Sequence, residues 1–146
     1  MRLRHLRFVS LALTALLFAP QLWAEPGTWN PNCRQGETFV RVVTWCTGPT
    51  TAACVAGTGT YVNLTGYTAK LQLRDTSTGT VIDEFTDTTG LALGGVAGTI
   101  TWTVTATETT ALPVGSLAYD LRLTSGASIV TYLLAGHVAV QKRITQ

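Results

Sequence analysis

The sequence predicts an all-β protein, an antiparallel β-sandwich of about seven strands. Apolar and polar residues alternate strictly in Tyr67–Arg74, and Leu117–Thr124 repeats this pattern. Successive side chains of a strand point to opposite faces, so each run is expected to be a strand with one buried face. The composition agrees, because the chain is rich in Thr, Val, Ala and Gly and poor in Lys and Glu. A small barrel or a jelly roll is the alternative architecture.

Five further segments have the composition and the flanking turn residues of strands. They are Glu37–Cys46, Val81–Thr86, Leu91–Leu93, Thr99–Ala106 and Ile129–Val140. Between two of the strands, Ser77-Thr78-Gly79 predicts the turn of a hairpin. Thr107–Leu112 lies just ahead of Pro113 and predicts one helical turn, without a full capping box at Thr107.

The apolar positions of these strands share one period-two phase, which predicts a single core between two sheets. The expected core residues are Tyr67, Leu71, Leu73, Ile100, Trp102, Val104, Tyr119, Leu121 and Leu123. Arg74 and Arg122 fall in the opposite phase. We therefore expect both to point outward, with Asp75 or Asp120 as cross-strand partners.

Residues 1–24 have the pattern of a secretory signal. Arg2, Arg4 and Arg7 precede an apolar run, and Ala24 is the small residue that cleavage sites require. The apolar run is shorter than the roughly 20 residues of a membrane-spanning helix. An uncleaved anchor and a misassigned gene start are the alternatives.

The chain after the signal predicts a single domain, with a lead-in arm at 25–36 and a β-sandwich domain at 37–146. The arm is rich in Pro, Gly and Asn and shows no periodicity. Three of the ten Lys and Arg residues lie in the signal, which leaves seven basic against eight acidic residues. A near-neutral chain lacks the electrostatic footprint of nucleic-acid binding. No later segment is long and apolar enough to span a membrane, so we expect neither nucleic acid nor a membrane as a partner.

The three cysteines are Cys33, Cys46 and Cys54. Cys46 and Cys54 flank a loop with Gly48 and Pro49, and a disulfide between them would close that loop if they end adjacent strands. Free thiols are the equally weighted alternative. The spacing of Cys46 and Cys54, with no histidine nearby, does not favour a zinc site.

The residues that could carry catalysis are scattered. His137 is the one histidine outside the signal. Asp83 and Glu84 are neighbours, so on a strand they point to opposite faces. No nucleophile motif, phosphate loop or metal-ligand spacing is present. We therefore expect a non-enzymatic protein with no catalytic, cofactor or metal site, in which these three residues are dispensable.

The surface most expected to make contacts is the loop Thr47–Tyr61, together with the arm. Long loops on rigid scaffolds tend to carry contacts, and exposed edge strands can pair with other chains. The candidate contact residues are Trp29, Thr47, Pro49, Thr51 and Thr58. The alternatives are that Trp29 packs across a sheet edge and that the loop contacts nothing.

Several motifs stand in an order that resembles a family of small tailed-bacteriophage proteins. They are Gln35–Phe39, Val62–Arg74, Gly98–Thr101, Ala111–Gly115 and Ala118–Leu121. The family is similar to the N-terminal domain of the phage baseplate upper protein, an immunoglobulin-like β-sandwich. The resemblance spans about residues 35–145, nearly the whole chain after the signal.

The resemblance implies a virion structural protein: a baseplate, tail or capsid-surface module that contacts other virion proteins and copies of itself. It carries no active site and no cofactor onto this chain. Two features depart from the family, namely the signal at 1–24 and the loop between Cys46 and Cys54. They favour the alternative, an exported β-sandwich binding module that is periplasmic or secreted.

Overall fold

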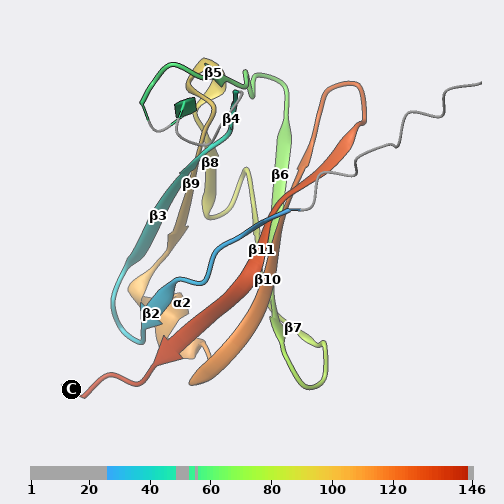
Figure 1. Cartoon of the computed structure of the whole chain (residues 1–146). Coiled ribbons are helices and arrows are strands. Elements are labelled where there is room, and N and C mark those ends of the chain that lie inside the picture. The colour runs from blue at the N-terminus through green and yellow to red at the C-terminus, as the bar shows by residue number, and fades with distance from the viewer. Residues whose placement is uncertain (1–25, 49–52, 55, 145–146) are drawn as a thin grey trace, which may run out of the picture.

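The structure, a computed structural model, describes residues 26–48, 53–54 and 56–144. Within these residues two large β-sheets pack face to face as an immunoglobulin-like sandwich, with a short helix at one end (Figure 1). The strands are β1 (Gly27–Thr28), β2 (Asn32–Arg34), β3 (Phe39–Thr44), β4 (Cys46–Thr47), β5 (Thr60–Tyr61), β6 (Thr68–Asp75), β7 (Val81–Thr86), β8 (Leu91–Leu93), β9 (Thr99–Val104), β10 (Gly115–Thr124) and β11 (Val130–Gln141). A 3₁₀ turn, η1 (Gly95–Ala97), and the helix α2 (Ala106–Ala111) complete the described elements. The predicted all-β sandwich is confirmed. The predicted signal at 1–24 lies outside the described residues.

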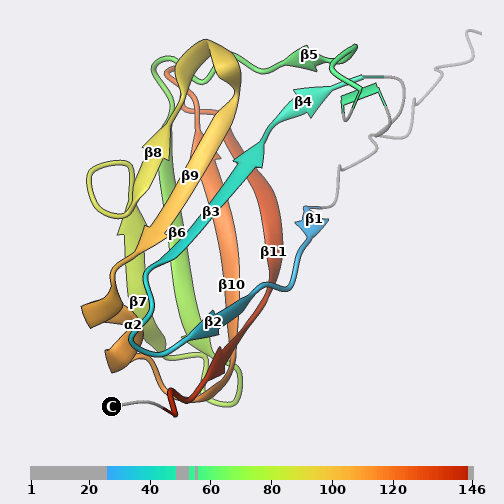
Figure 2. The same cartoon turned by 90° about the vertical axis from the view of Figure 1, so that its left-hand side faces the viewer.

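The larger sheet has the strand order β1-β11-β10-β6-β7, and β2 also pairs with β11. Its four long strands are antiparallel, and β10 and β11 stay paired from Gly115 and Val140 to Thr124 and Val130. In contrast, β1 and β2 run parallel to β11. The smaller sheet has the order β3-β9-β8, which Figure 2 shows in front of the larger one.

The first predicted strand, Glu37–Cys46, is shorter and interrupted in the structure. The ladder of β3 with β9 covers Phe39–Thr44, and the backbone N–H of Trp45 then bonds the carbonyl of Gly98. Beyond that point Cys46 and Thr47 leave the smaller sheet and pair with β5. The chain therefore changes partners at Trp45. The apolar character of this residue in the sequence does not predict that change.

The core lies between the two sheets, as the shared phase predicts. Eight of the nine expected core residues are at most 5% exposed, and Tyr67 is half-buried against the same core. Trp102 is the centre of an aromatic group, with ring centroids 4.9 Å from Phe39, 5.7 Å from Phe85 and 5.6 Å from Tyr119. Phe39 and Phe85 meet Trp102 edge-on, and such contacts stabilise a core beyond the burial of the rings.

The lead-in arm is part of the sandwich, although its sequence shows no strand periodicity. Both β1 and β2 come from it and lie along β11. The strands have only two and three residues, too few for alternation to be recognised in a sequence. The absence of periodicity in the arm therefore does not exclude strands, which the structure has at Gly27–Thr28 and Asn32–Arg34.

The predicted helical turn is confirmed, but it begins earlier than expected. Thr105 is the N-cap of α2 and forms a full capping box with Glu108: the Thr105 side chain accepts from the Glu108 backbone, and the Glu108 carboxylate accepts from the Thr105 N–H at 2.7 Å. Thr107, expected to begin the turn, lies inside it. The helix then ends ahead of Pro113, as predicted.

Candidate interaction surfaces

The loop between β4 and β5 is closed by a disulfide between Cys46 and Cys54, whose Cα atoms are 5.8 Å apart. The sequence left open either this disulfide or free thiols, and the structure has the disulfide. Gly59 passes against it so closely that a Cβ atom there would overlap Cys46 Sγ and lie 2.9 Å from Cys54 Sγ. Cys33 is not in a disulfide; it is buried, and burial raises the pKa of its thiol.

The expected contact residues of this loop are exposed where the structure describes them. The Thr47 hydroxyl donates to the Thr60 carbonyl at 3.3 Å, and the Thr58 hydroxyl donates to the Ala53 carbonyl at 3.1 Å. Pro49 and Thr51 lie outside the described residues. No partner is present to test the loop, so its role in contacts stays a prediction.

Trp29 lies between β1 and β2, half-buried along the sheet edge. Its backbone N–H donates to the Ala135 carbonyl at 3.2 Å, and its carbonyl accepts from the Tyr119 hydroxyl at 2.8 Å. The chain passes so close to β11 that a Cβ atom on Gly136 would overlap the Trp29 carbonyl oxygen. The backbone of the arm is thus fastened to the sandwich. Whether the Trp29 side chain contacts a partner or packs across the sheet edge stays a prediction.

The acid and base candidates do not converge in the structure. His137 is exposed on β11, and its backbone N–H donates to Asn30 Oδ1 at 2.9 Å. Asp83 and Glu84 point to opposite faces of β7 as expected: burial raises the pKa of Asp83, whereas hydrogen bonds from Lys70 and then Gln72 lower the pKa of Glu84. Within the described part of the chain, no three His, Cys, Asp or Glu side chains are arranged to hold a metal ion, and no helix is long and apolar enough to cross a membrane.

The outer face of the smaller sheet carries no charged residue among those described. Its outward positions follow from the register of β3, β9 and β8, in which Val40 pairs with Thr103 and Val42 with Thr101. The full set is Val40, Val42, Thr44, Ala92, Thr99, Thr101 and Thr103. Val40 and Val42 are 45% and 60% exposed and lie on β3, an end strand of this sheet. We call these seven residues the Val/Thr face.

The outer face of the larger sheet is charged and hollowed. A hollow of about 270 Å³ lies over β6, β10 and β11 and is lined by Lys70, Gln72, Arg74, Asp120, Arg122 and Tyr132. The expected cross-strand ion pairs of Arg74 are absent from the described residues: Arg74 bonds Gln72 and the Gly79 carbonyl instead. Asp75 is engaged in its own turn, where it accepts from Ser77 and Thr78. Alternation predicts which side chains face outward, but it does not predict the hollow.

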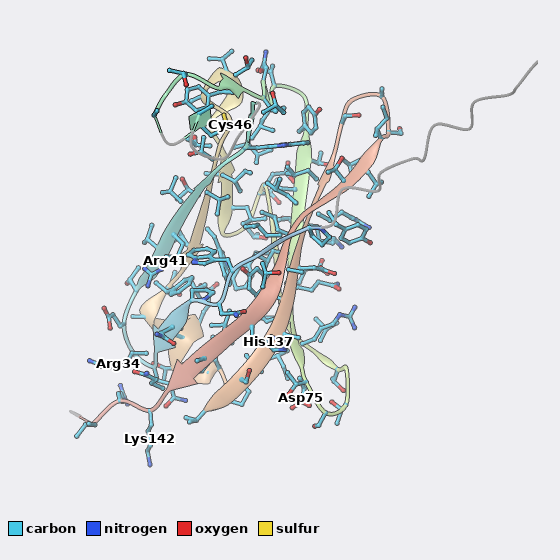
Figure 3. The ribbon with its side chains drawn as sticks, viewed as in Figure 1. Arg34, Arg41, Cys46, Asp75, His137 and Lys142 are labelled. Atoms are coloured by element: carbon cyan, nitrogen blue, oxygen red, sulfur yellow. A yellow bond between two sulfur atoms is a disulfide. The ribbon has the colours of Figure 1, made fainter. Side chains whose placement is uncertain are left out.

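A second group of basic residues lies at the end of the sandwich where β2 and the C-terminal segment meet; Figure 3 labels Arg34 and Lys142 there. Arg34, Glu37 and Arg41 line a groove of about 300 Å³ between β2 and β3. The Arg41 guanidinium is 4.5 Å from the centroid of the Phe39 ring and donates to the Val40 carbonyl at 2.8 Å. Arg41 also donates to the Asn32 carbonyl at 3.4 Å and thus links β3 to β2.

Comparisons with known proteins add similarity of fold only. No protein-family model matches the sequence, and neither does any curated protein. Solved structures to which the chain is similar include a chicken TCR, at a TM-score of 0.45 and 11% identity over 81% of this chain and 56% of that chain. CopC from Methylosinus trichosporium OB3b has a TM-score of 0.38 and 14% identity, over 80% of this chain and 89% of that chain. Extracellular domains 3-5 of Drosophila OTK have a TM-score of 0.32 and 14% identity, over 82% of this chain and 33% of that chain. At these TM-scores the similarities carry no inference about what the chain does.

Proposed function

We propose that this protein is a non-enzymatic structural module of a bacteriophage virion, a baseplate, tail or capsid-surface part that acts through protein–protein contacts. The observation that carries the proposal is the Val/Thr face. The buried centre of a protein interface is depleted of charge, and this face has no charged residue across its three strands. The motif order of the sequence supports the virion as the setting, with other virion proteins or further copies of this chain as partners.

The face is suited to contact because it is regular, exposed and backed by a packed core. Phe39, Ile100 and Trp102 fill the inner side of the same strands and are at most 4% exposed. Val40 and Val42 add aliphatic area at the end strand, where an incoming chain is not hindered by a neighbouring strand of this sheet. A rigid flat surface of this kind loses little conformational freedom on binding.

Mass spectrometry of purified particles tests the proposal. We expect the protein in the particles at a fixed ratio to the major virion proteins, and its absence from them would contradict the virion role. The double variant Val40→Lys, Val42→Lys puts two charges on the Val/Thr face and should reduce incorporation. The matched control is Val96→Lys, Val114→Lys, since those valines are 75% and 56% exposed elsewhere on the surface. Equal incorporation of both double variants would exclude the Val/Thr face as the contact.

The second candidate function is an exported binding module, periplasmic or secreted, and the Cys46–Cys54 disulfide favours it. Disulfides persist in oxidising compartments and are rare in the cytosol, where phage particles assemble. Cell fractionation separates the two candidates. The exported module would be recovered from the periplasm or medium with an N-terminal peptide that begins near Glu25, whereas a virion part would sediment with the particles.

A further inference from the structure

Two irregularities in the strand pairing lie beside the hollow on the outer face of the larger sheet. The register of β10 with β11 shifts between Leu121 and Arg122, and the register of β6 with β7 shifts between Leu73 and Arg74. One shift thus lies on each side of the central pair β6–β10. Bulges of this kind bend a strand, increase its twist and redirect side chains. The hollow of about 270 Å³ lies over the strands between them.

One side of the hollow is held in place by a continuous chain of polar contacts. Glu84 forms an ion pair with Lys70 at 2.9 Å and accepts from Gln72 Nε2 at 2.5 Å. Gln72 Oε1 accepts from Arg74 at 2.6 Å, and Arg74 also donates to the Gly79 carbonyl at 2.9 Å. Because each group fixes the next, the Arg74 guanidinium is positioned before any ligand arrives. Several of its N–H donors stay unused by the described residues.

The other side of the hollow consists of groups that have no such partner. Asp120, Arg122 and Tyr132 line the same hollow and make no side-chain hydrogen bond or ion pair with any described residue; the charge of Arg122 acts on Glu84 at longer range and helps to lower the pKa of that carboxyl. Arg122 and Tyr132 are directly opposite each other in the ladder of β10 and β11, and Tyr132 is 49% exposed. A guanidinium, a carboxylate and an aromatic ring thus converge with their binding capacity unused.

The charges and shape of the hollow indicate what it binds. Lys70, Arg74 and Arg122 stand against the carboxylates of Asp120 and Glu84, of which Glu84 pairs with Lys70 and also attracts Arg122. One positive charge is left over, so a ligand that carries one negative charge is favoured. A simple anion would gain nothing from the Asp120 carboxylate or the Tyr132 ring. A sugar uses both, because its hydroxyls donate to a carboxylate and its C–H groups pack on the negative face of an aromatic ring.

We propose that this hollow binds an acidic carbohydrate, one residue of which carries a carboxylate. The planar guanidinium groups of Arg122 and Arg74 receive the sugar carboxylate, since such forks match carboxylate geometry. Asp120 accepts from the hydroxyls, and the Tyr132 ring supports the sugar face. The volume is close to the lower end of small-molecule pockets, which suits one sugar residue with its neighbours outside. The proposal goes beyond the proposed function and does not depend on it, since the hollow and the Val/Thr face lie on different sheets.

Binding of the purified protein to immobilised glycans tests the proposal. The probes are glycans that end in glucuronic, galacturonic or sialic acid, beside matched neutral glycans that end in glucose or galactose. We expect binding to an acidic glycan, weakened by salt, and no binding to its neutral counterpart. Arg122→Ala and Tyr132→Ala should each weaken it about tenfold or more, because a hydrogen bond to a charged group and a stacked ring are lost.

Two variants outside the hollow are the controls, because each removes the same type of side chain, an arginine or a tyrosine, from another part of the surface. Arg34→Ala removes a basic residue at the end of the sandwich, and Tyr61→Ala removes a tyrosine that is 44% exposed on β5. Both should bind like the unaltered protein. Arg122→Lys keeps the charge but loses the fork, so it should bind less tightly than the unaltered protein.

Three results would overturn the proposal: no binding to any carboxylated glycan, equal binding to acidic and neutral glycans, or acidic binding that Arg122→Ala and Tyr132→Ala leave unchanged. A Glu-rich peptide is the further probe. If that peptide competes with the glycan at equal affinity, the hollow recognises carboxylates of proteins rather than sugars, and the carbohydrate assignment fails.

Discussion

The hydroxyl of Tyr119 donates a hydrogen bond of 2.8 Å to the backbone carbonyl of Trp29, 90 residues earlier in the chain. Tyr119 stands on β10 with its ring in the core, 5% exposed, and Trp29 belongs to the arm that lies along β11. One side chain therefore joins the centre of the sandwich to its N-terminal edge. The bond also satisfies a backbone carbonyl that no strand ladder uses.

Tyr119→Phe is expected to destabilise the protein by about 1 kcal/mol, the net value of one such hydrogen bond. The ring and its contact with Trp102 are kept, so the variant loses only the hydrogen bond that joins β10 to the arm. Chemical denaturation measures the free energy of unfolding, and hydrogen exchange should show faster exchange of the Trp29 amide. The exposed Tyr61→Phe serves as the control. Unchanged stability and unchanged exchange at Trp29 would show that the bond does not fasten the arm.

Stability should fall at high pH because of the same tyrosine. Burial raises the pKa of Tyr119 to about 12, above the value of about 10 expected in the unfolded chain. The folded state therefore holds the phenol proton more tightly, and this contribution to stability is complete below pH 10 and is lost between about pH 10 and 12. Denaturation midpoints of the unaltered protein should fall more steeply over this window than those of Tyr119→Phe. Parallel curves would contradict the prediction.

The close passage of the arm over β11 requires a residue without a side chain at position 136. A Cβ atom on Gly136 would overlap the Trp29 carbonyl oxygen and lie 2.8 Å from Asn30 Oδ1. Gly136→Ala should therefore displace the arm and cost about 1–3 kcal/mol, the usual range for overpacking. Gly126→Ala is the control, since its Cβ would meet only the Gly66 carbonyl at 3.5 Å. Equal melting curves for the two variants would show that the arm moves aside without cost.

Trp102 should be the most costly core position to truncate. It is 4% exposed and contacts three aromatic rings, so Trp102→Ala is expected to lose about 3–5 kcal/mol of unfolding free energy. Its buried indole N–H has no acceptor among the described residues. Trp102→Phe, which removes that N–H and keeps a ring, should lose less. A loss below about 1 kcal/mol for the alanine variant in denaturant melts would contradict burial of Trp102 in the folded protein.

Period-two alternation was enough to predict the core and most strand positions, because burial of one face is a local property of the sequence. Leu73, Trp102 and Leu121 show this, since each lies in the predicted phase and is at most 4% exposed. The arm could not be predicted, because β1 and β2 are too short to alternate and depend on contacts with β11. The change of partner after β3, which ends at Thr44, likewise depends on distant residues, because the Trp45 N–H donates to the Gly98 carbonyl whereas the Trp45 carbonyl accepts from Val62.

The candidate surfaces were likewise predicted in part from the sequence. Alternation placed Arg74 and Arg122 on the outer face correctly. It does not predict the register shifts near the hollow, one in the hairpin of β10 and β11 and one in the hairpin of β6 and β7. The partners of Arg74 were predicted wrongly for a related reason. Gln72 reaches Arg74 from two positions away on the same face of β6, whereas Asp75 is taken up by its own turn. A sequence shows which residues could pair with Arg74, and the local contacts of Gln72 and Asp75 decide which of them does.

The cysteines give a last prediction that also bears on where the protein works. Cys46 and Cys54 are 8 residues apart and cross-linked, and closing so short a loop should stabilise the fold by about 2–3 kcal/mol. The double variant Cys46→Ser, Cys54→Ser should lose this amount in denaturant melts, and so should the unaltered protein after reduction. Thiol labelling supplies an independent readout, because Cys33 is 4% exposed. The native protein should show no reactive thiol, the unfolded protein one, and the unfolded and reduced protein three. Protein isolated from its natural source that shows three thiols on unfolding without reductant would have been made in a reducing compartment, against the exported alternative.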